Sequence, residues 1–476
     1  MSTSGDDLSV IVVGASGDLA RKKVLPALFA LYCQGYLPKR FTIAGFSRTE
    51  LTHDAFRERI AEYLTCRYAP GESCAERMDE FLARCFYQPG RYGSRDSFLD
   101  LFQLLQEREE GRIGNRMYYL AVPPSVFLDV ARAIGGAGLV ECGETRPWSR
   151  IVIEKPFGRD RQTSDELVEE MAKVFTEAQT YRIDHYLGKE LVQDLLVLRF
   201  ANLVFEPLWN NRYVSDVLID WKEPIGVEGR GGYFDDYGII RDVIQNHMLQ
   251  ILALVAMECP VDSSAKCVRD AKVDVLRRVK TLGLADVAVG QYVAADGKGA
   301  HRPGYTEDPG IPDDSRTPTF ARAALSVENE RWKGVPFTIT AGKAMSVREN
   351  TVRIRFRGIE KNIFCGGPGC LPPNELVIRV QPDEGITLGV MNKQPGLGLS
   401  LVESTLDLRY KAAFSAEIPD AYERLLLDVI AGDKSLFIRS DELAAAWDIF
   451  TPVLHEMEEK QVKPLPYAFG TDGPGA

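Results

Sequence analysis

The sequence predicts an α/β plus α+β protein. We expect an N-terminal, doubly wound Rossmann-like dinucleotide domain over residues 8–183 and a β+α domain with a large, mostly antiparallel sheet over residues 184–476. Three observations support this. The chain has 476 residues, longer than a single hydrophobic core usually grows. Short apolar strands alternate with helical segments over about the first 180 residues, which is typical of a parallel sheet. Beyond them, strands that alternate apolar and polar residues cluster together, which is typical of an antiparallel sheet.

The elements follow in order along the chain. The first domain opens with an apolar strand at 10–13, a glycine turn and a helix with apolar residues at helical spacing, namely Val24, Leu25, Leu28, Phe29 and Leu31. Later strands are expected in "FTIAGFSRTEL", "MYYLAVPP" and "SRIVIEKPFG". In the second domain we expect strands in "SDVLIDWKEPIG", "TVRIRFRG", "LVIRVQP" and "ITLGVMN", with helices on one face of the sheet. Residues 296–318 are rich in Gly, Pro and Asp and predict a loop.

The composition excludes several classes of partner. Acidic residues outnumber basic ones 68 to 57, which gives a net charge of −11 and argues against nucleic acid or an anionic membrane as a partner. The opening residues show no secretory signal, and no window approaches the roughly 18 uninterrupted apolar residues of a membrane span, so we expect a cytoplasmic protein. The nine cysteines lack zinc-site spacing and predict buried thiols and no metal site. Cys365 and Cys370 in "CGGPGC" are the one candidate redox loop.

A phosphate-binding turn follows the first strand. In "VVGASGDLA", Gly14, Gly17 and Ala20 occupy the three small-residue positions of a dinucleotide turn. The helix that begins there would present free N–H groups to a pyrophosphate. The next strand ends in Ser47, Arg48 and Thr49, where an NAD enzyme usually carries a carboxylate. Arginine and hydroxyls suit a 2′-phosphate, so we expect NADP. Glu50 argues against this, and Arg48 could instead be a solvated loop cation.

Lys155 follows a buried strand, in "IVIEKPFG". Ligands of open parallel sheets lie outside the carboxyl ends of the strands, so this lysine is expected to face the cofactor cleft. Pro156 restricts Lys155 to extended geometry and permits a cis bond. The alternative is an ordinary surface turn.

The stretch "RIDHYLGKELV" combines an acid with an anion-binding set. If a helix begins near Leu187, then His185, Tyr186 and Lys189 meet free backbone N–H groups at its mouth and form an anion site. Asp184 would repel that anion, so it is better placed to orient a catalytic base.

A candidate base lies in the apolar helix "GIIRDVIQNHMLQILALVAM", where His247 sits among Asp242, Asn246 and Gln250. A histidine titrating near neutral pH can take a proton from a hydroxyl as its hydride leaves, although a lone histidine in such a helix could equally be a satisfied core residue. Glu223 and Lys343 end two further strands and could contact sugar hydroxyls, or could be ordinary charged strand ends.

The motifs "GASGDLA", "EKPFG", "RIDHYLGKE", "EGRGGYFDDYGIIRDVIQNH", "VENERWKGVPF" and "LVIRVQP" closely resemble the glucose-6-phosphate dehydrogenase family. The resemblance implies NADP-dependent oxidation of β-D-glucose 6-phosphate at C1 to 6-phosphogluconolactone, the first step of the oxidative pentose phosphate pathway. It makes His247 the general base and Asp184 its orienting acid.

The resemblance also assigns the remaining contacts. The phosphate grip falls on His185, Tyr186 and Lys189, and sugar contacts on Glu223, Asp242 and Lys343. Lys155 would bridge substrate and cofactor. NADP would be held by the turn residues Gly14, Ser16, Gly17, Asp18 and Leu19, together with Lys23 and Arg48. The family's large sheet pairs subunits, which implies a homodimer or a dimer of dimers.

The sequence departs from the animal-type members, which hold a second, structural NADP. Glu349, Thr387 and Gly389 replace residues that are basic or tyrosine there, although Arg353 and Arg379 remain, and no aromatic-bearing tail follows "YAFGTDGPGA". We therefore expect no structural NADP. Two other functions stay open: a dehydrogenase of an unphosphorylated sugar, and an NADP-binding regulator without turnover. The cationic "DHYLGK" segment argues against the first, and the intact Asp184 and His247 argue against the second.

Overall fold

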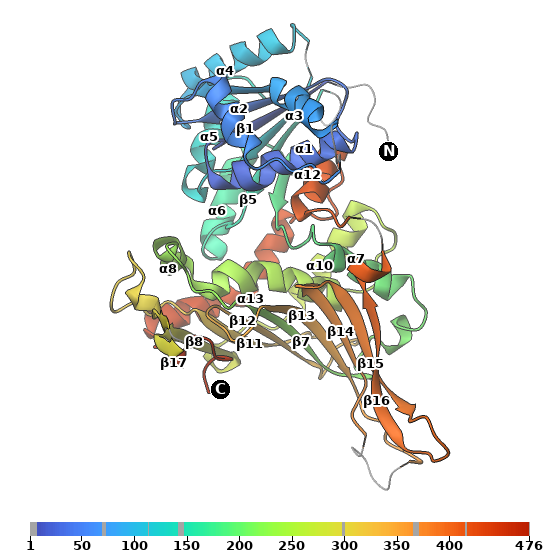
Figure 1. The fold of residues 1–476 in the computed structure, drawn as a ribbon. Coiled ribbons are helices and arrows are strands. Elements are labelled where there is room, and N and C mark those ends of the chain that lie inside the picture. The colour runs from blue at the N-terminus through green and yellow to red at the C-terminus, as the bar shows by residue number, and fades with distance from the viewer. Residues whose placement is uncertain are drawn as a thin grey trace.

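Two β-sheets organise the chain, one above the other in Figure 1, with helices between them. The structure is a computed structural model that describes residues 7–68, 73–112, 114–140, 147–297, 300–364, 371–414 and 417–475. The predicted α/β plus α+β class is confirmed. The boundary predicted between residues 183 and 184 stays a prediction, although the first sheet does end at Ile183.

The first sheet has six parallel strands in the order β3-β2-β1-β4-β5-β6. The strands are β1 (Leu8–Val13), β2 (Phe41–Ser47), β3 (Cys85–Pro89), β4 (Asn115–Leu120), β5 (Ser149–Glu154) and β6 (Thr180–Ile183). Strands β1 and β4 are buried along their whole length, which explains their nearly continuous apolar sequences. The strand order reverses between β1 and β4, and the crevice at such a switch point is where these sheets bind ligands.

Helices cover both faces of this sheet. They are η1 (Ala20–Val24, a π-helix), α1 (Leu25–Cys33), α2 (His53–Ala61), α3 (Ser73–Ala83), α4 (Arg95–Arg108), η2 (Pro124–Val126), α5 (Phe127–Gly136) and α6 (Arg161–Ala172). Thr52, Ser94 and Asp160 cap α2, α4 and α6 by accepting a backbone N–H with their side chains. A helix from the far end of the chain, α12 (Ala421–Ala431), lies against α1 (Figure 1).

The second sheet has nine strands in the order β16-β15-β14-β13-β7-β12-β11-β8-β17, and only the β7–β12 and β8–β17 pairs are parallel. The strands are β7 (Val214–Lys222), β8 (Val287–Val293), β11 (Phe320–Ser326), β12 (Pro336–Gly342), β13 (Glu349–Phe356), β14 (Glu375–Gln381), β15 (Gly385–Lys393), β16 (Leu401–Arg409) and β17 (Leu465–Ala468). The mostly antiparallel sheet that the sequence predicted is therefore present.

Helices lie over the face of this sheet that is turned toward the first domain (Figure 1). They include α8 (Gly231–Ile239), η4 (Ile240–Met248, a π-helix), α9 (Leu249–Ala256), α10 (Ala265–Arg277) and α13 (Ser440–Glu459). The second domain also contains α7 (Glu190–Phe200) and the short elements η3 (Glu206–Leu208), η5 (Leu284–Asp286), η6 (Tyr305–Glu307) and α11 (Tyr410–Ala413). The helical run 231–256, kinked at Gly238, is long and apolar enough for a membrane span, but 89% of its apolar window is buried in the protein, as in a core helix.

Two sequence predictions need correction. The expected loop at 296–318 contains part of a small antiparallel hairpin, β9 (Ala295–Gly297) with β10 (Ala300–Arg302), and the turn η6. Backbone pairing needs no apolar side chains, so composition alone missed it. Cys66 and Cys74 are joined in a disulfide, Cys259 is exposed and Cys267 is half-buried, so these four are not buried thiols. The disulfide joins residues eight apart, and no sequence pattern marks that approach. Cys365 and Cys370 lie outside the described residues.

Candidate active site

The dinucleotide turn is built so closely that only glycine fits its first position. Gly14 has φ +89°, and a Cβ there would lie 2.3 Å from the carbonyl oxygen of Ala121, at the end of the neighbouring strand. The N–H of Gly17 donates to the Gly14 carbonyl at 2.9 Å, and Leu19 precedes the first turn of η1. Asp18 is exposed and pairs with Arg21 and Lys22. Because the glycines have no side chain, a pyrophosphate could come close to the backbone N–H groups at this helix N-terminus.

The end of β2 carries the residues expected to choose between NADP and NAD. The Ser47 hydroxyl donates to Ser16 at 3.0 Å, and the Ser16 hydroxyl lies 3.1 Å from that of Thr49. The Arg48 guanidinium stacks over the Tyr92 ring, 5.2 Å from its centroid. The hydroxyl cluster and the stacked cation together suit a phosphorylated ribose and an adenine. Sequence reasoning missed Tyr92, because it lies 44 residues beyond Arg48 with no local motif.

Asp184 and His247 form a buried dyad. Asp184 follows β6 and His247 lies on the π-helix η4, and the Asp184 Oδ1 and His247 Nδ1 atoms are 2.5 Å apart. Their side chains are 1% and 4% exposed. The second carboxylate oxygen of Asp184 is buried, with no hydrogen-bond partner among the described residues. With Nδ1–H donated to the carboxylate, Nε2 keeps its lone pair and can accept a proton. The sequence predicted this pairing across 63 positions.

Burial and charge set the protonation of the dyad. Burial lowers the pKa of His247, and the nearby Lys155 ammonium lowers it further against the opposing effect of Asp184. Burial would raise the pKa of Asp184, but the positive charge and hydrogen bond of His247 outweigh it and lower that pKa. Near neutral pH the site therefore holds a carboxylate and a neutral imidazole, the states that a general base requires.

Aromatic rings surround the imidazole. The Tyr186 ring stacks on His247 with centroids 4.4 Å apart, and the His185 ring meets His247 edge-on at 4.7 Å. Tyr422, from α12, stacks on the other imidazole, His185. The Tyr186 hydroxyl accepts a hydrogen bond from Trp221 at 2.7 Å. Burial and His247 together hold the pKa of His185 well below its usual value.

The helix expected to begin near Leu187 begins instead at Glu190, with Lys189 as its N-cap. Residues 184–189 form a turn, in which the Asp184 carboxylate accepts the backbone N–H of Tyr186 at 2.9 Å and the Asp184 backbone carbonyl accepts that of Leu187 at 3.0 Å. The bond from the Asp184 side chain to the backbone stabilises this turn in place of a helix, which is why the apolar periodicity placed the start too early.

Four lysines predicted to bind ligands each contact an acceptor within the protein. Lys155 pairs with Asp242 at 3.0 Å and Lys343 with Glu223 at 3.2 Å, next to the dyad. Lys23 pairs with Asp420 at 3.0 Å, and the Lys189 ammonium donates to the Gln381 side chain. Burial lowers the pKa of Lys189, and Lys155 lowers the pKa of Asp242 against the effect of burial.

Lys23, from the first domain, and Lys189, from the second, line a common pocket of about 500 Å³ together with Arg67, His185, Gln381 and Tyr422. The fold thus gathers two residues of the predicted phosphate grip and one predicted cofactor lysine at one place, whereas Tyr186 does not line this pocket. Sequence reasoning missed Gln381, Asp420 and Tyr422. Gln381 could have been found, because it ends a strand in the motif "LVIRVQP", as Lys155 and Lys343 end theirs. Asp420 and Tyr422 begin a distant helix and carry no comparable signal.

Within the described parts of the chain, Asp184, His185 and His247 form the one group whose ligand atoms lie close enough, within 4.8 Å of one another, to hold a metal ion. The hydrogen bond between Asp184 and His247 already engages an atom of each. The sequence expectation that the protein needs no metal stays a prediction.

An imidazole free to take a hydroxyl proton, set beside a dinucleotide turn at the carboxyl edge of a parallel sheet, is the arrangement of an NAD(P)-dependent dehydrogenase. Residues 11–194 match the family described as "Glucose-6-phosphate dehydrogenase, NAD binding domain", and residues 196–476 match its C-terminal domain. The chain belongs to the glucose-6-phosphate dehydrogenase family.

Individual relatives agree over nearly the whole chain. It is 53% identical to glucose-6-phosphate 1-dehydrogenase 1, chloroplastic, of Arabidopsis thaliana, covering 99% of this chain and 82% of that protein. It is 45% identical to the Dictyostelium discoideum enzyme, covering 98% and 92%. A solved glucose-6-phosphate dehydrogenase in complex with its substrate is 40% identical with a TM-score of 0.92, covering 100% and 97%. The Mycobacterium avium structure is 32% identical with a TM-score of 0.83, covering 98% and 95%.

Proposed function

We propose that the protein oxidises β-D-glucose 6-phosphate at C1 and transfers the hydride to NADP, giving 6-phosphogluconolactone. The observation that carries this proposal is the buried Asp184–His247 pair, with Lys155 beside it at the end of β5. A relative of known structure binds the same sugar phosphate at 40% identity over the whole chain.

The dyad supplies the proton chemistry. His247 Nε2 takes the proton of the C1 hydroxyl, while Asp184 fixes the tautomer and stabilises the imidazolium that forms. NADP, held at the dinucleotide turn, would supply the hydride acceptor for C1. Lys155 lies between the dyad and the dinucleotide turn. Its ammonium pairs with Asp242 and has further N–H donors that can contact both substrate and cofactor.

The remaining side chains give the site its preference for anions. The Lys189 ammonium and the imidazole of His185 would hold the 6-phosphate, and Lys343, paired with Glu223, would contact the sugar. Tyr186 is engaged with Trp221, so its main contribution is to pack against the imidazole of His247. Arg48 and the hydroxyls of Ser16 and Thr49 would receive the 2′-phosphate of NADP.

Initial rates of NADPH appearance test this function. They should be measured with glucose 6-phosphate and free glucose, with NADP and NAD, on the parent protein and on His247→Asn. We expect a rate that requires the phosphate, prefers NADP and falls by roughly 10²- to 10⁴-fold in the variant. Turnover of free glucose would favour the unphosphorylated-sugar dehydrogenase. NADP binding without turnover would favour the regulator.

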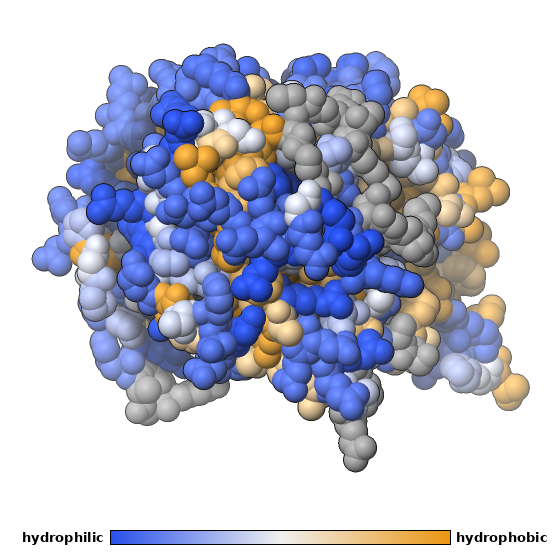
Figure 2. Space-filling model, turned by 90° about the horizontal axis from the view of Figure 1, so that it is seen from above, coloured by the Kyte–Doolittle hydropathy of each residue, from blue (hydrophilic) through white to orange (hydrophobic). Residues whose placement is uncertain are grey.

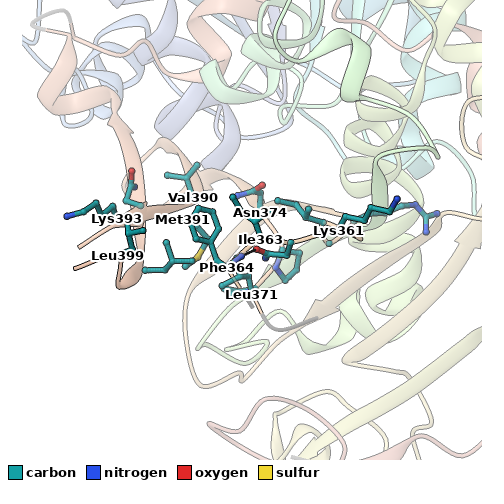
Figure 3. Close-up of a pocket in the computed structure, with 17 residues that line it drawn as sticks. Lys361, Ile363, Phe364, Leu371, Asn374, Val390, Met391, Lys393 and Leu399 are labelled. Carbon is teal, nitrogen blue, oxygen red and sulfur yellow. Dashed lines mark hydrogen bonds between the residues drawn. The ribbon is translucent and has the colours of Figure 1, made fainter. Parts of the chain in front are cut away.

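We infer further that the protein assembles as a homodimer or a dimer of dimers through the β15–β16 edge of the large sheet. Val402, Leu406 and Leu408 are exposed on β16, an edge strand with a free side. Hydrophobic side chains gather at the right of Figure 2, the side on which this hairpin and α7 lie in Figure 1. Ile363 and Phe364, together with Val390 and Met391 of β15, line a pocket of about 500 Å³ at this hairpin (Figure 3).

Light scattering coupled to size exclusion tests the assembly. We expect a mass of two or four times 53.0 kDa, shifted toward one chain by Leu406→Glu but not by Leu465→Glu, a control at the opposite end of the sheet. A parent protein that runs as a single chain contradicts the inference.

A cytoplasmic location stays our proposal on the composition of the sequence. Fluorescence imaging of the tagged full-length protein decides between the cytoplasm and the chloroplast, which is the compartment in the names of several relatives.

A further inference from the structure

Glu154 is a buried carboxyl that the proposed proton and hydride transfers leave unused. It is the last residue of β5, directly before Lys155, and is 8% exposed. The Tyr119 hydroxyl, from the neighbouring strand β4, donates to Glu154 Oε1 at 2.5 Å. The Tyr422 hydroxyl also interacts with this carboxyl. The two phenols thus replace water as polar neighbours of a buried carboxyl group.

Through these bonds Glu154 joins two parts of the site. Along its own strand it is covalently linked to Lys155, whose ammonium contacts Asp242 beside the dyad. Across the domain boundary it contacts Tyr422, whose ring lies parallel to that of His185 with centroids 6.2 Å apart. His185 in turn meets His247 edge-on. One carboxyl therefore has a short physical path to the lysine on one side of the reacting centre and to the imidazoles on the other.

The charged and titratable groups that face Glu154 come from four elements. They are Tyr119 from β4, Tyr422 from α12, Lys155 at the end of β5 and Asp184 after β6. Burial raises the pKa of Glu154 to about 7, and Asp184 raises it, while the two tyrosine hydroxyls and Lys155 lower it. The tyrosines themselves stay protonated, because burial and Glu154 raise their pKa values.

We propose that Glu154 is a positioning residue of the dehydrogenase reaction, whose carboxylate fixes the strand end at Lys155 and the Tyr422–His185 stack in one geometry. This proposal rests on the proposed function. Ionisation strengthens the Tyr119 hydrogen bond and the interaction with Tyr422, and it places a negative charge near Lys155 and the imidazole that becomes positive during the reaction. Protonation weakens the clamp and removes that charge, so turnover should fall on the acid side as Glu154 takes up its proton.

The pH profiles of kcat and kcat/KM in two variants test the proposal, because the variants shift them in opposite directions. In Glu154→Gln the carboxylate charge is absent at every pH. The fall of kcat and kcat/KM on the acid side should therefore move to lower pH, where only the protonation of His247 causes it, and kcat at high pH should fall roughly ten-fold. In Tyr119→Phe the carboxylate loses a donor, so its proton is held more tightly and the acid limb should move to higher pH. KM for both substrates should change by less than about three-fold in each.

A merely structural role for Glu154 predicts lower activity with an unmoved profile, and that outcome overturns the proposal. Acid limbs of the pH profiles that move in the same direction in both variants overturn it as well. So does a Glu154→Gln enzyme with the parent's kcat and pH profile. Thermal melting of each variant at pH 6 checks that the fold persists. A parent protein without turnover contradicts the proposed function instead. In that case the pH dependence of NADP binding, followed by tryptophan fluorescence, shows whether the two variants shift the pH response of the site around Lys155 in opposite directions.

Discussion

Replacement of Asp184 by Asn tests the dyad without changing its shape. The carboxylate oxygen lies 2.5 Å from His247 Nδ1, and both side chains are buried, so water cannot replace the lost acceptor. An Asn side chain can turn its N–H₂ toward Nδ1, which moves the imidazole proton to Nε2 and removes the lone pair that accepts the substrate proton. We take the penalty for restoring the active tautomer, with the lost stabilisation of the imidazolium, as about 3 to 5 kcal/mol, equivalent to roughly 10²- to 10⁴-fold in kcat.

Initial rates of NADPH formation across the pH range measure this loss. NADP affinity, measured by fluorescence titration, should stay within about three-fold, because Asp184 contacts no part of the dinucleotide turn. Asp160→Asn is the matched control: Asp160 also contacts a histidine, His455 at 3.2 Å, but the pair is far more exposed and Asn caps helices as well as Asp does. A variant at Asp184 that keeps the parent's kcat within about three-fold would refute the assignment of the dyad.

Three further predictions follow from the same geometry. Lys189→Gln should raise KM for glucose 6-phosphate roughly ten- to hundred-fold with a smaller change in kcat, because a charge-assisted hydrogen bond to the phosphate is lost; an unchanged KM would remove Lys189 from the phosphate grip. Arg48→Ala should weaken NADP roughly ten-fold or more while leaving NAD nearly unaffected in competition titrations, and equal losses for both would place Arg48 elsewhere. Glu154 has a folded-state pKa of about 7 against an ordinary 4.5, so the parent should lose stability as the pH rises through this window, on the order of 3 kcal/mol in total. Denaturant titrations at pH 5 and pH 8 should show no such loss of unfolding free energy in Glu154→Gln. An equal change of unfolding free energy with pH in the two proteins would show that the carboxyl does not titrate in this range.

The local pattern of the sequence was enough to predict both sheets. Strands β1 and β4 are buried along their length, and continuous apolar runs mark such strands directly. In β14 buried side chains alternate with more exposed ones, which is the signal of a sheet with one covered face. The small hairpin at β9–β10 and the disulfide between Cys66 and Cys74 escaped, because each depends on where the surrounding fold brings the backbone.

The site divides in the same way. Asp184, His247 and Lys155 stand out because polar residues interrupt apolar elements at the ends of strands or within a core helix, and they do converge. The partners that occupy the lysines do not stand out. Asp420 and Gln381 are ordinary polar residues in the sequence, and only tertiary structure places them against Lys23 and Lys189. The start of α7 was misplaced because a cap at Asp184 overrides apolar periodicity over six residues.

The position of α12 has a consequence for how the chain matures on the ribosome. The strands of the nucleotide-binding sheet are complete at Ile183, yet α12, which covers α1, emerges roughly 250 residues later. Until then α1 has an uncovered face, Lys23 lacks Asp420, and the Arg150 guanidinium lacks the carbonyl groups of Val429 and Ile430. The domain made first is thus finished nearly last. A nascent chain stalled before residue 420 would expose apolar surface that the finished protein hides, and such chains are the natural clients of chaperones.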